Sequence, residues 1–236
     1  MVLGLMLADA FSSFWLRHWR AWGLWAMGMT CLGVAVVVAY EGRFAQPILL
    51  QLLDGVAKLD VMDFGSPAGW ARTFGFGFLL PLAIGFPAAV WASGLLLDEG
   101  EELALLLSYP YPRWQVLLGR WLALMVGGMV ACVAGSAPLG VWVLLRQGWG
   151  VLGVENGLAL LLWGMAWANV ALCVGLWSGK AWAGRWVAGL GLILIQVVLF
   201  VGVGVRWISL LVWFGGVGVF GLGLAFWLFG RRDVGG

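Results

Sequence analysis

The chain has 236 residues, of which 63% are hydrophobic and only 10% are charged. A soluble domain of this size carries about 25% charged residues, so a soluble globular protein is excluded. The net charge of +2 excludes no class of partner. We therefore expect an all-α integral membrane protein that forms a single transmembrane domain over residues 1–236 and does not bind nucleic acid.

Residues 1–20 predict an amphipathic helix that lies in the membrane interface. A signal peptide would carry its positive charge before its apolar core, and here the charge follows it. The single histidine, His18, reads as a residue at headgroup level. The polar residues recur every three or four positions, which is the helical period: they are Asp9, Ser12, Ser13, Arg17 and Arg20.

Six apolar runs follow, and each is long enough to cross about 30 Å of hydrocarbon. Two prolines, Pro81 and Pro87, fall inside the second run, where neighbouring helices must satisfy the carbonyls that proline leaves free. Arg206 alone separates the fifth run from the sixth, which indicates that one of these two helices stops short or re-enters the membrane. The predicted spans are 21–40, 74–97, 114–145, 157–178, 186–205 and 207–229.

The segment 41–72, between the first two spans, predicts a helix outside the bilayer core. Gln51, Asp54 and Lys58 are spaced for one face of a helix, and apolar residues cover the other face. Residues 60–67 then read as a loop. The segment is either a lid over the substrate or a cap that packs on the bundle.

The most polar stretch is 98–113, and it lies between two long uncharged runs, so it must surface into water. It predicts a short helix that Pro110 and Pro112 end, because proline lacks the amide donor and clashes with the preceding turn. A second helical run begins near Arg113 and leads into the third span. The charged residues of the stretch are Asp98, Glu99, Glu101, Glu102 and Arg113.

The distribution of Lys and Arg predicts the orientation of the chain. With the N-terminus inside, the inner segments hold eight of these residues and the outer segments hold five. We therefore expect both termini and the 98–113 segment to be cytoplasmic, in a multi-pass protein of the cell inner (plasma) membrane.

No catalytic site, cofactor site or metal site can be assembled from the sequence, so no enzyme activity is expected. A single histidine excludes an HExxH zinc site and bis-histidine haem ligation. Spans free of Asp, Glu, Lys and Arg are also expected, which disfavours a proton-coupled carrier or an ion pump. Asn169 and Gln196 are the candidate substrate-path residues, although polar groups in spans more often hold helices together.

The run LLLDEGEELALLLSYPYPRWQVLLGRWLA, residues 95–123, resembles the signature region of ABC-2 type transporter permeases. It has acidic residues and a glycine after the second span, then a Leu-rich helix, a proline turn with a basic residue, and LLG-Arg entering the third span. Within that family it is most similar to the permeases of nitrous oxide reductase copper-maturation transporters. The interfacial helix, six spans and inner termini extend the likeness to nearly the whole chain.

The resemblance implies that two permease chains pair, as a homodimer or a heterodimer, in a membrane that supplies lipid contacts. Each chain would dock a separate cytoplasmic ABC ATPase subunit, two copies in all, whose closure pushes the coupling helix and tilts the third span to export or process a substrate. The docking residues implied are Asp98, Glu99, Gly100, Glu101, Glu102 and Arg113.

Other functions stay open. A haem-exporter-type permease and a lipid- or peptide-exporting permease are alternatives to a role in copper, sulfur or cytochrome maturation. A membrane anchor subunit of a redox complex is a rival class, and it would need cofactor ligands within the spans. A secondary transporter would need charges inside the membrane or an internal repeat.

Overall fold

The computed structural model describes residues 2–42, 66–95, 113–148, 154–202 and 207–231. These residues are almost entirely helical, and no strand occurs among them. Four helical segments are long and apolar enough to cross a membrane, namely 7–41, 67–94, 113–147 and 156–178, and 215–231 is a shorter apolar helix. The chain is therefore an all-α, multi-pass membrane protein, as its composition predicts.

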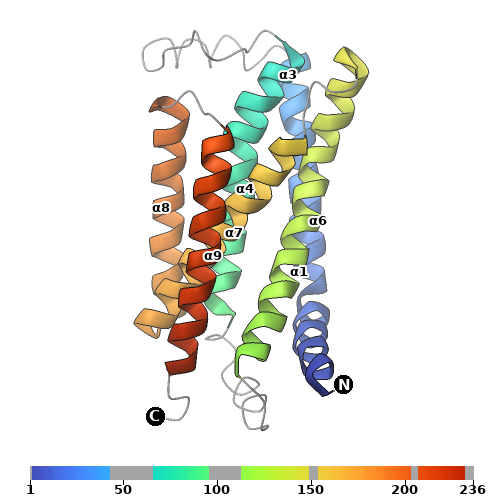
Figure 1. Ribbon diagram of the computed structural model, residues 1–236. Coiled ribbons are helices and arrows are strands. Elements are labelled where there is room, and N and C mark those ends of the chain that lie inside the picture. The colour runs from blue at the N-terminus through green and yellow to red at the C-terminus, as the bar shows by residue number, and fades with distance from the viewer. Residues whose placement is uncertain (1, 43–65, 96–112, 149–153, 203–206, 232–236) are drawn as a thin grey trace.

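Successive helical rods run in opposite directions along the bundle (Figure 1). The N-terminal end of α1 and the C-terminal end of α9 consequently lie at the same end, which we call the terminal end; the opposite one is the far end. α3, η2 and α4 follow one another without a break. The described helices are α1 (Val2–Glu41), α3 (Pro67–Trp70), η2 (Ala71–Leu79), α4 (Leu80–Gly94), α6 (Arg113–Gln147), α7 (Val154–Ser178), α8 (Ala181–Gly202) and α9 (Trp207–Arg231).

α1 differs from the expected pair of separate helices because it continues through residue 20 without a break. Its 40 residues make it about 60 Å long, which is twice the thickness of the hydrocarbon layer. Residues 21–40 alone match that thickness. The helix stays continuous because no proline interrupts it and because α6 packs beside it.

α1 and α6 lie parallel and approach each other at glycines of α6. A Cβ atom at Gly127 would lie 2.5 Å from the Trp22 ring, and one at Gly135 would lie 2.7 Å from Met29. Nearer the terminal end, Gly119 faces the backbone of α1 at Leu7. Small residues at such contacts let two membrane helices approach closely, so van der Waals packing holds this pair together.

The second group of helices is built around α4 and α7, with α8 and α9 packed beside them. Gly85 of α4 receives the side chain of Leu192 from α8, and Gly184 of α8 faces the Ala171 carbonyl of α7. These close approaches again depend on the missing side chain of glycine. The bundle therefore consists of an α1–α6 pair and an α3/η2/α4–α7–α8–α9 group.

The second rod begins earlier than residue 74, where the sequence places the start of the span. The Ser66 hydroxyl accepts a hydrogen bond from the Gly69 amide at 3.0 Å, and Pro67 occupies the first turn, so this is a capped helix start. Arg72 therefore lies inside a helix rather than in a connection. The predicted helix within 41–72 and its loop fall mainly on 43–65, outside the described residues. The helices α6, α7, α8 and α9 agree with the remaining predicted runs to within about five residues.

Three prolines lie inside helical rods of the bundle, namely Pro81, Pro87 and Pro138. Each lacks the amide that would bond the carbonyl four residues earlier. For Pro81 and Pro87, a side chain from a neighbouring helix donates to that carbonyl, as the sequence predicts. The pairs are Gln196 Nε2 with Gly77 O and Trp25 Nε1 with Ala83 O (3.1 Å). At Pro138, the Thr30 hydroxyl lies 3.3 Å from the freed Ala134 carbonyl but only 2.9 Å from the Ala26 carbonyl of its own helix, and it has one proton to donate.

The α1–α6 contact generates the first prediction. Gly127→Ala should destabilise the protein by about 1–3 kcal/mol, because the new methyl group overlaps the buried Trp22 ring. Gly140→Ala is the matched control, since nothing lies within 4 Å of a Cβ atom there. Thermal unfolding in detergent should show a lower Tm for the first variant and an unchanged or higher Tm for the control. Equal Tm values would contradict the packing.

Candidate functional site at the terminal end

The candidate site lies where α4 ends at Leu95 and α6 begins at Arg113, because the acidic stretch 98–113 connects these two points. The side chain that binds the two helices to each other is Arg120, in the second turn of α6. It is completely buried. Its Nη1 atom donates a hydrogen bond of 2.8 Å to the backbone carbonyl of Leu95.

The same guanidinium also contacts α1. Its Cζ atom lies 5.9 Å from the centre of the Phe14 ring, within the range of a cation–π interaction. Arg120 of α6 therefore contacts α1 and the end of α4 at one point, and it joins three helices. A buried charge is costly unless it is bonded, so this side chain restrains the relative position of the three helices.

The prediction that the spans contain no charged residues is wrong for Arg120. The predicted span 114–145 already includes Arg120, but its charge was counted with the cytoplasmic connection seven residues earlier. α6 begins at Arg113, as predicted, and its buried face includes Arg120 together with Leu117 and Leu124. Arg185 likewise lies inside α8 rather than before it.

Aromatic rings fill the α1–α4 contact beside Arg120. The Trp22 ring of α1 lies 4.5 Å from Trp91 of α4, and Trp25 lies 4.9 Å from the same ring. Edge-to-face pairs of this kind contribute about 0.5–1.5 kcal/mol beyond their burial. His18 belongs to the same group, with its ring centre 4.6 Å from Phe14.

Further buried polar atoms occur at this end. Trp22 Nε1 and Gln115 Oε1 have no hydrogen-bond partner among the described residues. Both side chains are at most 4% exposed. Sequence reasoning did not single out Gln115, because a glutamine two residues after a charged stretch reads as solvent-facing; its burial follows from the packing of α6.

Of the residues predicted to dock an ATPase, Asp98, Glu99, Gly100, Glu101 and Glu102 lie outside the described part of the chain. Arg113 is described. It is the first residue of α6 and is partly buried. Arg120 follows it by seven residues, which places the two guanidinium groups on the same side of the helix, two turns apart.

The two candidate substrate-path residues lie between helices. Asn169 is fully buried, donates to the Gly218 carbonyl at 2.7 Å and accepts from Trp121 Nε1 at 2.8 Å, so it joins α6, α7 and α9. Gln196 bonds the Gly77 carbonyl that Pro81 leaves free. In both cases the described contacts join helices, and a role toward substrate stays a prediction.

The α1–α6 pair meets the other helices along a seam, where relatively few residues touch. Side-chain hydrogen bonds cross this seam along its whole length. Some donate from α1 or α6 to the second group, and others donate from the second group to α1 or α6. Besides Arg120 with Leu95, Trp25 with Ala83 and Trp121 with Asn169, these bonds include Trp70 Nε1 with Val36 O (3.0 Å) and the Ala68 amide with Gln147 Oε1 (3.2 Å).

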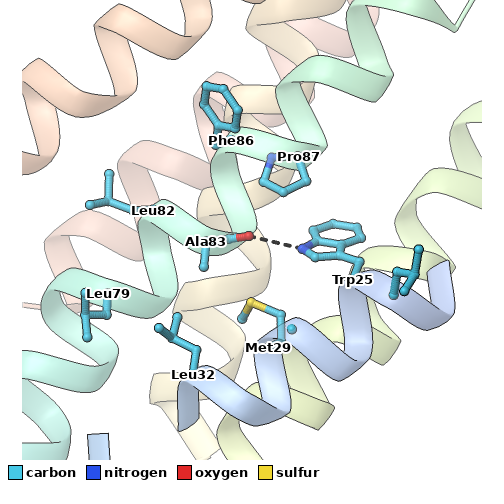
Figure 2. A pocket seen from close by; sticks show the side chains of 10 residues that line it. Trp25, Met29, Leu32, Leu79, Leu82, Ala83, Phe86 and Pro87 are labelled. Carbon is cyan, nitrogen blue, oxygen red and sulfur yellow. Dashed lines mark hydrogen bonds between the residues drawn. The ribbon is translucent and has the colours of Figure 1, made fainter. Parts of the chain in front are cut away.

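An open apolar groove lies on the seam between α1 and η2/α4 (Figure 2). Its volume is about 540 Å³, and Leu24, Gly28 and Leu32 line one wall while Leu82 and Phe86 lie on the other. Trp25 points across it to the Ala83 carbonyl. The groove lies along the uncharged half of α1.

At the far end, a separate polar contact joins α1 to α6. The Arg146 guanidinium forms a salt bridge of 2.8 Å with Glu41, and Trp142 Nε1 donates to the same carboxylate at 2.9 Å. The α1–α6 pair is thus joined by a salt bridge at the far end and by the contact of Arg120 with Phe14 toward the terminal end. If α1 and α6 move together, the contacts that change are those across the seam and not those between α1 and α6.

Comparison with protein-family models, with curated proteins and with solved structures found no match to this chain. Its function must therefore be inferred from the physical features of the bundle and from the resemblance carried by residues 95–123.

The Arg120 contacts generate the second prediction. Arg120→Met should destabilise the protein by about 1.5–3 kcal/mol, because it removes a charged hydrogen bond to Leu95 and leaves the end of α4 less restrained. Hydrogen exchange measured by mass spectrometry should rise at the end of α4. Arg231→Met, at an exposed position on α9, is the control. Unchanged exchange at 92–95 would contradict a restraining role for Arg120.

Proposed function

We propose that this chain is the membrane-spanning permease subunit of an ABC transporter, moved by a separate ATPase that docks on the 98–113 segment. One observation carries the proposal: the acidic, proline-interrupted segment joins α4 to α6 at the point where buried Arg120 of α6 contacts α1 and the end of α4. A force applied to that segment would reach the membrane helices directly.

The proposal includes six crossings of the membrane. α8 and α9 are 22 and 25 residues long, or about 33 and 37 Å, and each is therefore long enough to cross the hydrocarbon layer. The alternation of helix directions supports an even number of crossings, with both termini on one side. The chain would then have the six-span arrangement that its resemblance to ABC-2 permeases implies.

The terminal end is proposed to face the cytoplasm. Among the described residues, seven Lys and Arg side chains belong to that end and two to the far end. Those of the terminal end are Arg17, Arg20, Arg113, Arg120, Lys180, Arg185 and Arg231, and those of the far end are Arg72 and Arg146.

Exposed tryptophans support the same membrane placement. Those described are Trp19, Trp114, Trp177, Trp182, Trp186 and Trp227, and all of them belong to the terminal end. Tryptophan prefers the headgroup level, where its ring is apolar and its N–H stays hydrated. Three of them stack with a neighbouring cation: Arg20 over Trp19, Lys180 over Trp182 and Arg231 over Trp227.

The division of the bundle suggests how force would become movement. α6 receives the 98–113 segment at its first turn, and α1 packs along α6. Closure of a docked ATPase dimer would therefore tilt α1 and α6 together, and the seam with α4 and α7 would open or close. Arg120 lies at the pivot, because it is bonded to the end of α4.

The proposed partners and cargo follow from the resemblance to ABC-2 type permeases. The transporter would contain a second permease chain and two ATPase subunits. Its cargo would be a species exported or processed during copper, sulfur or cytochrome maturation, with haem, a lipid or a hydrophobic peptide as the alternatives. The candidate substrate-path residues are Asn169 and Gln196.

The docking proposal makes the third prediction. Reversing the charge in the double variant Glu101→Lys, Glu102→Lys should weaken binding to the ATPase and lower ATPase turnover in the complex at least roughly tenfold, a loss of about 1.4 kcal/mol. Asp9→Lys is the control, because it reverses an exposed acidic charge at the same end. Co-purification and turnover are measured together. Unchanged assembly and turnover in the double variant would refute docking at 98–113.

The orientation makes the fourth prediction. In a background with Cys31, Cys132 and Cys173 replaced, a cysteine introduced by Gln147→Cys should react with an impermeant maleimide in intact cells. One introduced by Ser12→Cys should react only after permeabilisation. Both positions are exposed in the structure, so accessibility does not bias the comparison. Reversed labelling would place the 98–113 segment outside the cell.

A further inference from the structure

The groove between α1 and η2/α4 has the character of a hydrocarbon-binding surface. Its lining is almost wholly apolar, and the one polar pair within it, Trp25 with Ala83, is already hydrogen-bonded. Gly28 forms part of the open wall, and nothing lies within 4 Å of where its Cβ atom would be. Leu24 and Phe86 are 63% and 49% exposed at its rims, so the groove opens sideways.

A positive charge stands at the end of this groove. The groove-lining stripe of α1 runs from Leu32 through Gly28 to Leu24 in steps of four residues, and the next step is Arg20. Arg20 is exposed, and its guanidinium lies 5.5 Å from the centre of the exposed Trp19 ring. An apolar trough that ends at a guanidinium matches a molecule with an apolar tail and an anionic head.

The depth of Arg20 fits a phospholipid headgroup. Arg20 lies 21 residues before Glu41, or about 31 Å along the helix, which equals the thickness of the hydrocarbon layer. With Glu41 at one membrane surface, Arg20 therefore lies at the other, beside the phosphates. Guanidinium binds phosphate through paired hydrogen bonds and is well suited to this position.

We propose that this groove retains one anionic phospholipid, with an acyl chain along Leu24–Leu32 and its phosphate at Arg20. A second copy of the chain fits the site less well. If two copies met at this groove about a two-fold axis along the membrane normal, their Arg20 groups would face each other at the same depth and repel. The inference rests on the position of α1 in the membrane and not on the proposed transport function.

The test compares phosphatidylglycerol with phosphatidylcholine on the purified full-length chain, using retained lipid in native mass spectrometry and the Tm increase on lipid titration. The wild-type protein should prefer phosphatidylglycerol roughly fivefold, the effect of one cation near an anionic headgroup. Arg20→Gln should abolish the preference and keep the binding of both lipids. Gly28→Leu should weaken both lipids by filling the groove.

Arg231→Gln is the matched control, because Arg231 also stacks on an exposed tryptophan at the same end but lies on α9. It should leave the preference unchanged. An equal loss in both arginine variants would show general attraction to anionic lipid and would overturn the site. A change of oligomeric state in Gly28→Leu, with lipid binding unaltered, would show that a second copy covers the groove, and it would overturn the proposal too.

Discussion

A backbone carbonyl inside a hydrocarbon layer has no water to bond, and this constraint shapes the bundle at two of its interior prolines. Pro81 and Pro87 each release a carbonyl, and a side chain from another helix bonds each one. Because these donors come from α8 and α1, the irregular positions of one helix become points of attachment for the next. A proline that would weaken an isolated helix here fixes helix pairs in register.

Side chains that bond backbone carbonyls of a neighbouring helix also join the two sides of the seam. Trp25 of α1 bonds the carbonyl freed by Pro87 in α4, and Trp70 bonds α1 in return. These bonds cross a contact that is otherwise sparse and that opens into an apolar groove. The α1–α6 pair, by contrast, has close packing at its glycines and a salt bridge at the far end. The proposed coupling movement and the proposed lipid site both lie at the seam.

Arg120 shows why one buried residue changes the functional interpretation. Sequence reasoning assigns a charge in the first two turns of a span to the water interface, since long basic side chains usually reach it. Here the C-terminal end of α4 and the N-terminal half of α1 cover that turn of α6, and the guanidinium bonds Leu95 instead. The continuous α1 that provides this cover was not predictable from the polar stripe of residues 1–20.

Some helix starts were predicted from the sequence, and one was shown only by the structure. The helices α6, α7, α8 and α9 begin and end within about five residues of the predicted runs, because uncharged runs bounded by charges or glycines mark them. The start of the second rod was missed because Arg72 suggested a connection, whereas Ser66 and Pro67 cap a helix there. Asn169 and Gln196 were predicted to be either glue or substrate contacts, and the described bonds show both of them joining helices.

The sequence by itself determined that this is a helical, multi-pass membrane protein with a polar segment between its second and third rods, because hydrophobicity and charge act locally and can be read residue by residue. Only the tertiary structure decided which helices pair, where the seam and groove lie, and that Arg120 is buried. Those properties depend on contacts between residues far apart in the chain, and a periodic pattern on one helix does not identify the helix that will cover it.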